Sequence, residues 1–157
     1  MWQRIQTVFL LVLIVSLIAS IFLPIWEVRN SEGKTHVLYA LHYSQKSPGE
    51  GSPAMAPSYL PYSLTGFFIV AAITIALIEI GKYKNRMLQM KLGALNSLFI
   101  AGAMVCAFYF ANGLRSGLGG VFGFGLWLPG LAVVCNLVAN QFIRRDERIV
   151  RDSQRLR

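Results

Sequence analysis

The amino-acid sequence predicts an all-α fold: a four-helix transmembrane bundle with cytoplasmic N and C termini and a small β-hairpin in the first outer loop. Three observations lead to this prediction: four long apolar segments, basic residues gathered at one set of their ends, and few charges elsewhere. Hydrophobic residues make up 55% of the 157 residues, and charged residues only 14%. A soluble class is excluded because helices in soluble domains need a polar face, which these segments lack.

Each apolar segment is long enough to cross a bilayer. Each holds about 19 or more residues almost free of charge, and at a rise of 1.5 Å per residue that length crosses a hydrocarbon core of roughly 30 Å. The segments are residues 1–25, 62–80, 92–111 and 121–143, and the first span itself covers about residues 5–25. Residues 1–157 therefore form a single integral membrane domain with an outer loop at 27–61 and a basic tail at 144–157.

The distribution of basic residues predicts the orientation. If the chain crosses four times, 11 of its 15 Lys and Arg residues fall on one side and 4 on the other. The positive-inside rule places the larger group in the cytoplasm, and both termini with it. This separation by side also argues against nucleic acid as a partner, although the net charge is +8. The four outer residues are Arg29, Lys34, Lys46 and Arg115.

The first segment is expected to be an uncleaved anchor. Residues 8–23 are long for the apolar region of a secretory signal, and no small-x-small cleavage site follows them. Aromatic residues that flank the spans are expected at the membrane interfaces, where Trp and Tyr gather. On this basis Trp2 and Tyr83 mark the inner interface, and Trp26, Tyr59, Tyr62, Tyr109 and Trp127 mark the outer one.

The first outer loop has two halves of different character. Residues 27–29 and 35–43 have strand-like composition around a turn at 30–33, which predicts a short hairpin. Residues 47–61 are rich in Pro, Gly and Ser, which is typical of a flexible tether. His36 and His42 lie in the first half, and two imidazoles alone do not form a zinc site. They are expected to be surface histidines.

The second and third spans form an antiparallel hairpin through a short basic inner loop at residues 81–91. Glu79 lies one residue from the end of the second span and is expected to reach toward Lys82 and water. The third span carries small residues at four-residue spacing, which let a neighbouring helix approach closely. Packing inside the bundle is favoured over self-association for this stripe, which consists of Gly93, Ser97 and Ala101.

The third loop is rich in glycine. Its glycines are Gly113, Gly117, Gly119, Gly120, Gly123 and Gly125. A dinucleotide-binding turn is excluded because the Gly-x-Gly-x-x-Gly pattern starting at Gly117 ends on Phe122, and no strand precedes it. We expect a loose outer turn that allows close helix approach, followed by a kink at Pro129 within the fourth span.

Three asparagines within the membrane are the candidate polar site. Asn136 and Asn140 are one turn apart on the fourth span, and Asn96 lies at a similar depth on the third. The hypothesis is a hydrogen bond from Asn96 to Asn140 or Asn136, worth roughly 0.6–2 kcal/mol. A functional alternative is a polar lining for a lipid headgroup or a quinone.

No catalytic, metal-binding or cofactor-binding constellation is present, so the prediction is that the protein is not an enzyme and holds no cofactor. By helix rise, Cys106 lies about 22 Å from Lys91, and Cys135 about 13 Å from Arg144. This depth mismatch of roughly 9 Å exceeds the Cα separation of about 7 Å that a disulfide tolerates. Both cysteines are therefore expected to be buried thiols.

Nothing in residues 144–157 breaks a helix, so the fourth span is expected to continue into the cytoplasm. Attraction of each nearby arginine to anionic headgroups is worth about 1 kcal/mol. The cytoplasmic basic face is also a candidate docking site for a protein partner. Its members are Lys82, Lys84, Arg86, Lys91, Arg144, Arg145, Arg148 and Arg151.

Segments on the expected cytoplasmic side resemble a known family. They are residues 3–7 (QRIQT), 84–92 (KNRMLQMKL), 136–140 (NLVAN), 143–147 (IRRDE), 150–151 (VR) and 155–157 (RLR). The chain resembles, over its whole length, the small bacterial membrane proteins of domain-of-unknown-function family 4293. The resemblance implies four spans and a location in the inner membrane, and it implies no activity.

Two functions remain from the sequence. The favoured one is a non-catalytic accessory or scaffold protein that presents its basic cytoplasmic face to a partner. The alternative is a carrier or a lipid- or quinone-binding protein with a polar cavity near Asn96, Asn136 and Asn140.

Overall fold

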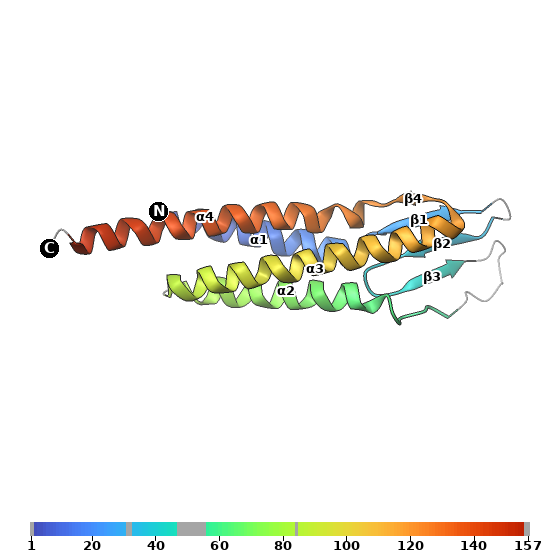
Figure 1. Ribbon diagram of the computed structural model, residues 1–157, viewed down its shortest axis with the longest axis horizontal. Helices are drawn as coiled ribbons and strands as arrows, with labels where there is room; N and C mark the ends of the chain where they lie inside the picture. Colours follow the sequence, from blue (N-terminus) through green and yellow to red (C-terminus); the bar gives the residue numbers. More distant parts are fainter. Residues whose placement is uncertain (1, 31–32, 47–55, 84, 156–157) are drawn as a thin grey trace.

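The computed structural model describes residues 2–30, 33–46, 56–83 and 85–155, and only the backbone of residues 2–4 and 150–155. Four long helices form an elongated bundle with a small sheet at one end (Figure 1). The helices are α1 (Trp2–Phe22), α2 (Ser63–Gly81), α3 (Arg86–Leu118) and α4 (Leu128–Arg155). All four are long and apolar enough to cross a membrane, which confirms the predicted helix count. Residues 47–55 of the expected tether, Lys84 and the side chain of Arg151 lie outside the described residues.

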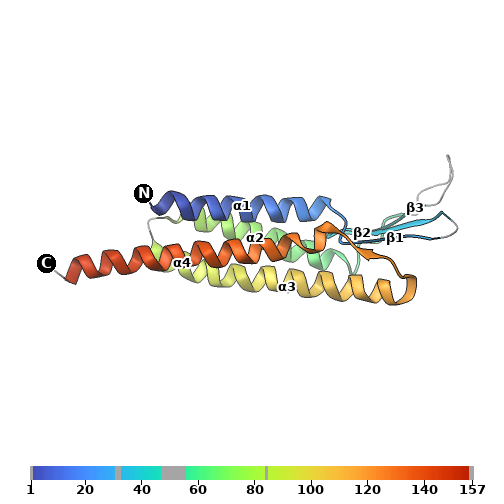
Figure 2. The same cartoon turned by 90° about the horizontal axis from the view of Figure 1, so that it is seen from above.

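Helices α2, α3 and α4 contribute small residues to the packed interior, whereas α1 contributes mainly leucines. α1 packs mainly on α4, α2 on α3, and α3 on α4, and the views in Figures 1 and 2 agree with this arrangement. The inward faces carry alanines that are fully or almost fully buried, which lets the backbones approach closely. They are Ala72, Ala76, Ala103, Ala107, Ala132 and Ala139.

Large apolar side chains cover the outside of the bundle. Val15 is 65% exposed, Phe67 63% and Leu98 68%. An apolar outer surface of this extent is rare on soluble monomers and fits a hydrocarbon solvent. The distribution of side chains therefore agrees with helices that face lipid.

The sheet extends the predicted hairpin to four strands. The hairpin is confirmed, since β1 (Trp26–Arg29) pairs antiparallel with β2 (Thr35–Leu38). β3 (Tyr43–Lys46) and β4 (Val121–Phe122) complete an antiparallel sheet in the order β3-β2-β1-β4. The all-α prediction is therefore corrected by a small sheet built from two parts of the chain that are distant in sequence.

The glycine-rich segment forms part of this sheet and is not a loose turn. After α3, Gly120 has φ 92°, and a Cβ there would lie 2.6 Å from the backbone oxygen of Glu27. Only glycine lets β4 approach β1 this closely. A 3-10 turn, η1 (Phe124–Leu126), follows, and α4 begins at Leu128. Pro129 thus lies in the first turn of α4, where its missing N–H is not needed, so the kink expected near the outer end of the fourth span is wrong.

Trp26 ties the sheet to the end of α3. Its side chain is 0% exposed, and its Nε1–H donates a hydrogen bond of 3.1 Å to the backbone oxygen of Gly119. Trp26 is therefore a core residue that does not face lipid. The indole packs in the core because β1 turns it inward, where the Gly119 carbonyl satisfies its N–H.

Candidate functional site

Buried polar residues lie on the inward faces of α2, α3 and α4, in the half of the bundle nearer the α2–α3 connection. We call them the polar cluster. Their exposed fractions range from 0% to 8%, although most of their neighbours are apolar. Intramembrane polar groups of this kind are costly and are often functional. The members are Glu79, Gln89, Asn96, Asn136 and Asn140.

Asn136 joins α4 to α3. Its Nδ2 donates hydrogen bonds of 2.8 Å to the backbone oxygen of Gly93 and to Ser97 Oγ. Ser97 Oγ in turn donates to the Gly93 oxygen at 3.1 Å. Packing of Gly93 and Ser97 inside the bundle is thus confirmed, whereas Ala101 of the same stripe is exposed.

The predicted hydrogen bond from Asn96 to Asn136 or Asn140 is wrong. Asn96 is fully buried, as expected, but neither its Oδ1 nor its Nδ2 has a hydrogen-bond partner among the described residues. Asn136 instead uses the backbone carbonyl of Gly93. The Asn140 side chain packs directly over Gly93, in the space that a Cβ would occupy. Gly93 on α3 therefore supplies both the hydrogen-bond acceptor for Asn136 and the space for the Asn140 side chain.

Glu79 points into the bundle and not toward Lys82 and water, so that expectation is wrong. Its exposed fraction is 0%, and neither carboxyl oxygen has a hydrogen-bond partner within the described part of the chain. Ile69, Ala72, Ala76 and Glu79 recur at helical spacing on the buried face of α2, which explains the inward direction. Gln89 donates a hydrogen bond of 2.9 Å from Nε2 to the backbone oxygen of Glu79.

Gln89 was missed in the sequence analysis because α3 begins at Arg86 and not at residue 92. Within the longer helix, Gln89 lies seven residues before Asn96 and so on the same face. The signal was available, since the side chain of Asn85 caps this helix by accepting a hydrogen bond of 3.1 Å from the N–H of Leu88.

Among the described side chains, the polar cluster leaves several buried oxygen and nitrogen atoms without a hydrogen bond. They are both carboxyl oxygens of Glu79, Gln89 Oε1, both amide atoms of Asn96, Asn136 Oδ1 and Asn140 Oδ1. An unsatisfied buried polar group costs about 1–3 kcal/mol. The polar cluster therefore lowers the stability of a bundle whose apolar and alanine contacts hold it together.

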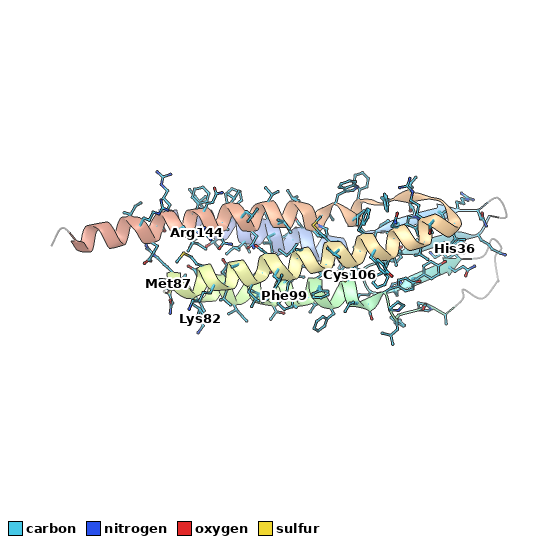
Figure 3. All side chains as sticks on the ribbon, viewed as in Figure 1. His36, Lys82, Met87, Phe99, Cys106 and Arg144 are labelled. Atoms are coloured by element: carbon cyan, nitrogen blue, oxygen red, sulfur yellow. The ribbon has the colours of Figure 1, made fainter. Side chains whose placement is uncertain are left out.

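Basic residues gather at the end of the bundle opposite the sheet. Figure 3 shows Lys82 and Arg144 there, and His36 at the far end. Arg86 begins α3 and donates from Nη1 to the backbone oxygen of Asp146 at 2.7 Å, which connects the α2–α3 hairpin to α4. We call this set the basic end. Its members with described side chains are Lys82, Arg86, Lys91, Arg144, Arg145 and Arg148.

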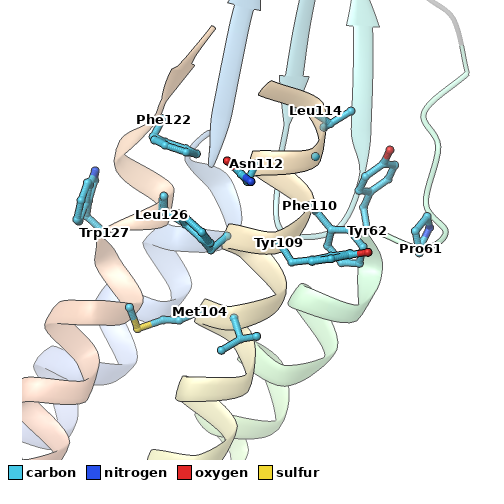
Figure 4. A pocket seen from close by; sticks show the side chains of 13 residues that line it. Pro61, Tyr62, Met104, Tyr109, Phe110, Asn112, Leu114, Phe122, Leu126 and Trp127 are labelled. Atoms are coloured by element: carbon cyan, nitrogen blue, oxygen red, sulfur yellow. The ribbon is translucent and has the colours of Figure 1, made fainter. Parts of the chain in front are cut away.

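A groove with a volume of about 930 Å³ lies near the sheet, between the outer part of α3 and the segment leading into α4 (Figure 4). We call it the aromatic groove. None of the three asparagines lines it, so it is not the polar cavity considered from the sequence. Sequence analysis missed it because α3 was expected to end at residue 111 and ends at Leu118. Its lining residues are Pro61, Tyr62, Met104, Val105, Phe108, Tyr109, Phe110, Asn112, Gly113, Leu114, Phe122, Leu126 and Trp127.

His36 contacts a tyrosine side chain, and the two cysteines are free. His36 is buried in β2, contrary to expectation, and its Nδ1 lies 2.5 Å from the hydroxyl oxygen of Tyr43. Burial, with the nearby Tyr62 as a smaller cause, raises the pKa of Tyr43 above its ordinary value of 10.0. Cys106 and Cys135 are free thiols, and Cys135 is buried as expected, whereas Cys106 is only half-buried, contrary to expectation.

Comparison with protein-family models identifies the family of this chain. A family model described as "Domain of unknown function (DUF4293)" matches residues 2–156, which include the polar cluster, the aromatic groove and the basic end. The resemblance seen in the sequence is confirmed. No curated protein matches the chain.

Proposed function

The chain belongs to the DUF4293 family, and because that domain has no known function, we propose from the geometry that the protein is a non-catalytic accessory or scaffold protein. On this proposal it is a multi-pass protein of the bacterial cytoplasmic membrane with both termini in the cytoplasm. It presents the basic end to a cytoplasmic or membrane protein partner.

The observation that carries the proposal is the extension of α4 past the bundle. Ile143 is 0% exposed, whereas Arg144 and Arg145 are exposed, so the packed core ends there. The helix continues to Arg155 and projects beyond the other helices (Figure 1). Twelve further residues correspond to about 18 Å at the rise of an α-helix.

The Arg86 contact supports a defined direction for this extension. The hydrogen bond from Arg86 to the Asp146 backbone oxygen lies just past the end of the core. A helix held at its base presents charged side chains in a reproducible arrangement, which suits recognition of a partner. Arginine also suits binding of carboxylates and phosphates, since its guanidinium forms paired hydrogen bonds.

Two kinds of contact are expected at the basic end. Anionic lipid headgroups attract arginines near the membrane surface. A protein partner with acidic side chains would bind farther along the extension. Most basic residues lie at one end of the bundle. This distribution supports a role for them in membrane orientation and argues against nucleic acid as a partner.

The carrier alternative receives less support from the geometry. It requires a cavity at Asn96, Asn136 and Asn140. Asn140 fills the space over Gly93, and the amide nitrogen of Asn136 is committed to α3. The aromatic groove lies at the other end of the bundle, next to the sheet (Figure 4).

The test is recovery of a partner after cross-linking in native membranes and extraction with a gentle detergent. Replacement of Arg144, Arg145 and Arg148 by Gln should abolish co-purification of the partner. A matched variant with Arg29 and Lys46 replaced by Gln removes charge from the sheet end and should retain it. Thermal unfolding by circular dichroism checks that both variants are folded. The proposal fails if no partner is recovered, or if the triple variant still retains it.

Orientation has a separate test in a background with Cys106 and Cys135 replaced by Ala. A membrane-impermeant maleimide should label Ala56→Cys in intact cells, and should label Lys82→Cys only after the cells are opened. The reverse pattern would contradict cytoplasmic termini.

A further inference from the structure

The aromatic groove lies at a defined depth if the bundle is embedded as proposed above. Counting from the exposed Lys91 at the cytoplasmic boundary, about 20 residues of α3 cross a hydrocarbon core of roughly 30 Å. Met104, Val105 and Phe108 then lie in the outer leaflet. Asn112 and Arg115 lie beyond the hydrocarbon, at the level of the lipid headgroups.

Aromatic residues on both sides of the groove support this depth. Tyr109 on α3 is 73% exposed, and Trp127 before α4 is 67% exposed. Figure 4 shows them on opposite sides, with Leu126 between them. Such residues are typical of the region where hydrocarbon meets headgroups.

A cation stands at the headgroup end of the groove. The guanidinium carbon of Arg115 lies 4.9 Å from the centroid of the Phe122 ring, and Phe122 stacks on Phe108 at 5.9 Å. Within the described residues, Arg115 forms no ion pair with a carboxylate. A guanidinium held in this way is a suitable partner for a phosphate.

We propose that the aromatic groove is a phospholipid-binding site that takes an acyl chain of an anionic phospholipid from the outer leaflet, with the phosphate at Arg115. The groove is apolar below Asn112, and Arg115 lies beside its headgroup end, over the lining residue Phe122, and this arrangement matches one lipid molecule. A transmembrane helix of a second copy would present an apolar face along its whole length, and so would not match. A volume of about 930 Å³ is also in the range of roughly 300–1,000 Å³ that small-molecule sites occupy. The inference rests on the proposed membrane orientation and not on the cytoplasmic partner.

The experiment uses the full chain in nanodiscs that contain phosphatidylglycerol or phosphatidylcholine with a diazirine on one acyl chain. After photolysis, mass spectrometry locates the label. We expect the acyl-chain diazirine of phosphatidylglycerol to label residues 104–110 and 126–127 most strongly. Val105→Trp fills the groove and should reduce this labelling at least several-fold. Val134→Trp is the matched control, because Val134 is also exposed (57%) but lies on α4 outside the groove.

The headgroup is tested with Arg115→Gln. Loss of this cation should lower phosphatidylglycerol labelling roughly five-fold, to the level of phosphatidylcholine. Arg29→Gln, which removes a basic residue from β1, should leave the preference unchanged. If Val105→Trp fails to insert, Phe108→Trp serves as a second groove-filling variant.

Three results would overturn the inference. One is that the photolabel is no more abundant on groove residues than on the face of α4 that carries Val134. Another is a headgroup preference that survives Arg115→Gln. The third is cross-linking between two copies from a photoreactive amino acid placed at Val105. Replacing Arg144, Arg145 and Arg148 by Gln should leave the groove labelling intact, so this site and the cytoplasmic partner can fail separately.

Discussion

Gln89 donates a hydrogen bond of 2.9 Å to the backbone oxygen of Glu79, and the Glu79 carboxyl group beside it has no hydrogen-bond partner among the side chains that the structure describes. The bond joins the last turn of α2 to the first turns of α3. The side chain of Glu79 therefore adds a desolvation cost to a contact that its backbone already makes. At position 79, the backbone oxygen therefore stabilises the contact between the two helices, whereas the buried carboxyl group lowers the stability.

Glu79→Met should raise the stability of the bundle. Methionine is unbranched and of similar length, and it removes a buried polar group whose unsatisfied state costs about 1–3 kcal/mol. The bond from Gln89 to the backbone oxygen remains. Thermal unfolding in detergent measures the change, and Glu147→Met, at a half-exposed site on the α4 extension, should change little. A lower unfolding temperature for Glu79→Met would show that the carboxyl group has a stabilising partner.

Gly93→Ala should destabilise the bundle by about 1–3 kcal/mol, because the added methyl group overpacks the contact with Asn140. Gly113→Ala is the control, since a Cβ there has nothing within 4 Å, and it should stabilise α3 by up to about 1 kcal/mol. Asn140→Ala combined with Gly93→Ala should recover part of the loss, as expected for coupled neighbours. Equal effects of the two glycine substitutions on the unfolding temperature would contradict this contact.

The sequence was sufficient to predict the four long apolar helices, because their apolar character is summed over many residues. Their ends were harder to predict, since single polar residues decide them. Arg86 and Lys91 were placed in a loop although Asn85 carries a helix-capping side chain. The pairing of Trp26 with Phe122 could not be predicted, because it joins two segments on either side of two helices.

The candidate site could likewise be predicted from the sequence only in part. Burial of the three asparagines follows from their positions within apolar spans, and the sequence indicated it. Their hydrogen-bond partners could not be predicted in this way. The acceptor for Asn136 is the backbone oxygen of Gly93, and residue types do not reveal a backbone acceptor. The aromatic groove depends on where α3 ends relative to the start of α4, so an error in both boundaries concealed it.

The hydroxyl group of Tyr43 should make stability depend on alkaline pH. Burial raises its pKa above 10.0 in the folded protein, so the folded state holds the proton where the unfolded chain releases it. Its contribution is complete below pH 10 and falls as the pH rises through the folded pKa. Tyr43→Phe should therefore lose less stability than the wild type between pH 9 and pH 11. Tyr59→Phe, at a 59% exposed site, should behave like the wild type, and identical pH profiles for all three proteins would contradict the prediction.

Arg86→Gln should loosen the α4 extension without unfolding the bundle. The guanidinium of Arg86 bonds to the Asp146 backbone oxygen at the point where α4 leaves the core, so its loss removes the contact that restrains the base of the extension. A contact worth about 1 kcal/mol corresponds to a rise of roughly five-fold in amide hydrogen exchange for residues 147–155. Lys91→Gln changes the charge equally at an exposed position on α3 and should leave these rates unaltered. If the exchange rates of Arg86→Gln match those of the wild type, the extension owes its order to its own helical hydrogen bonds, and the basic end is not held in one arrangement by Arg86.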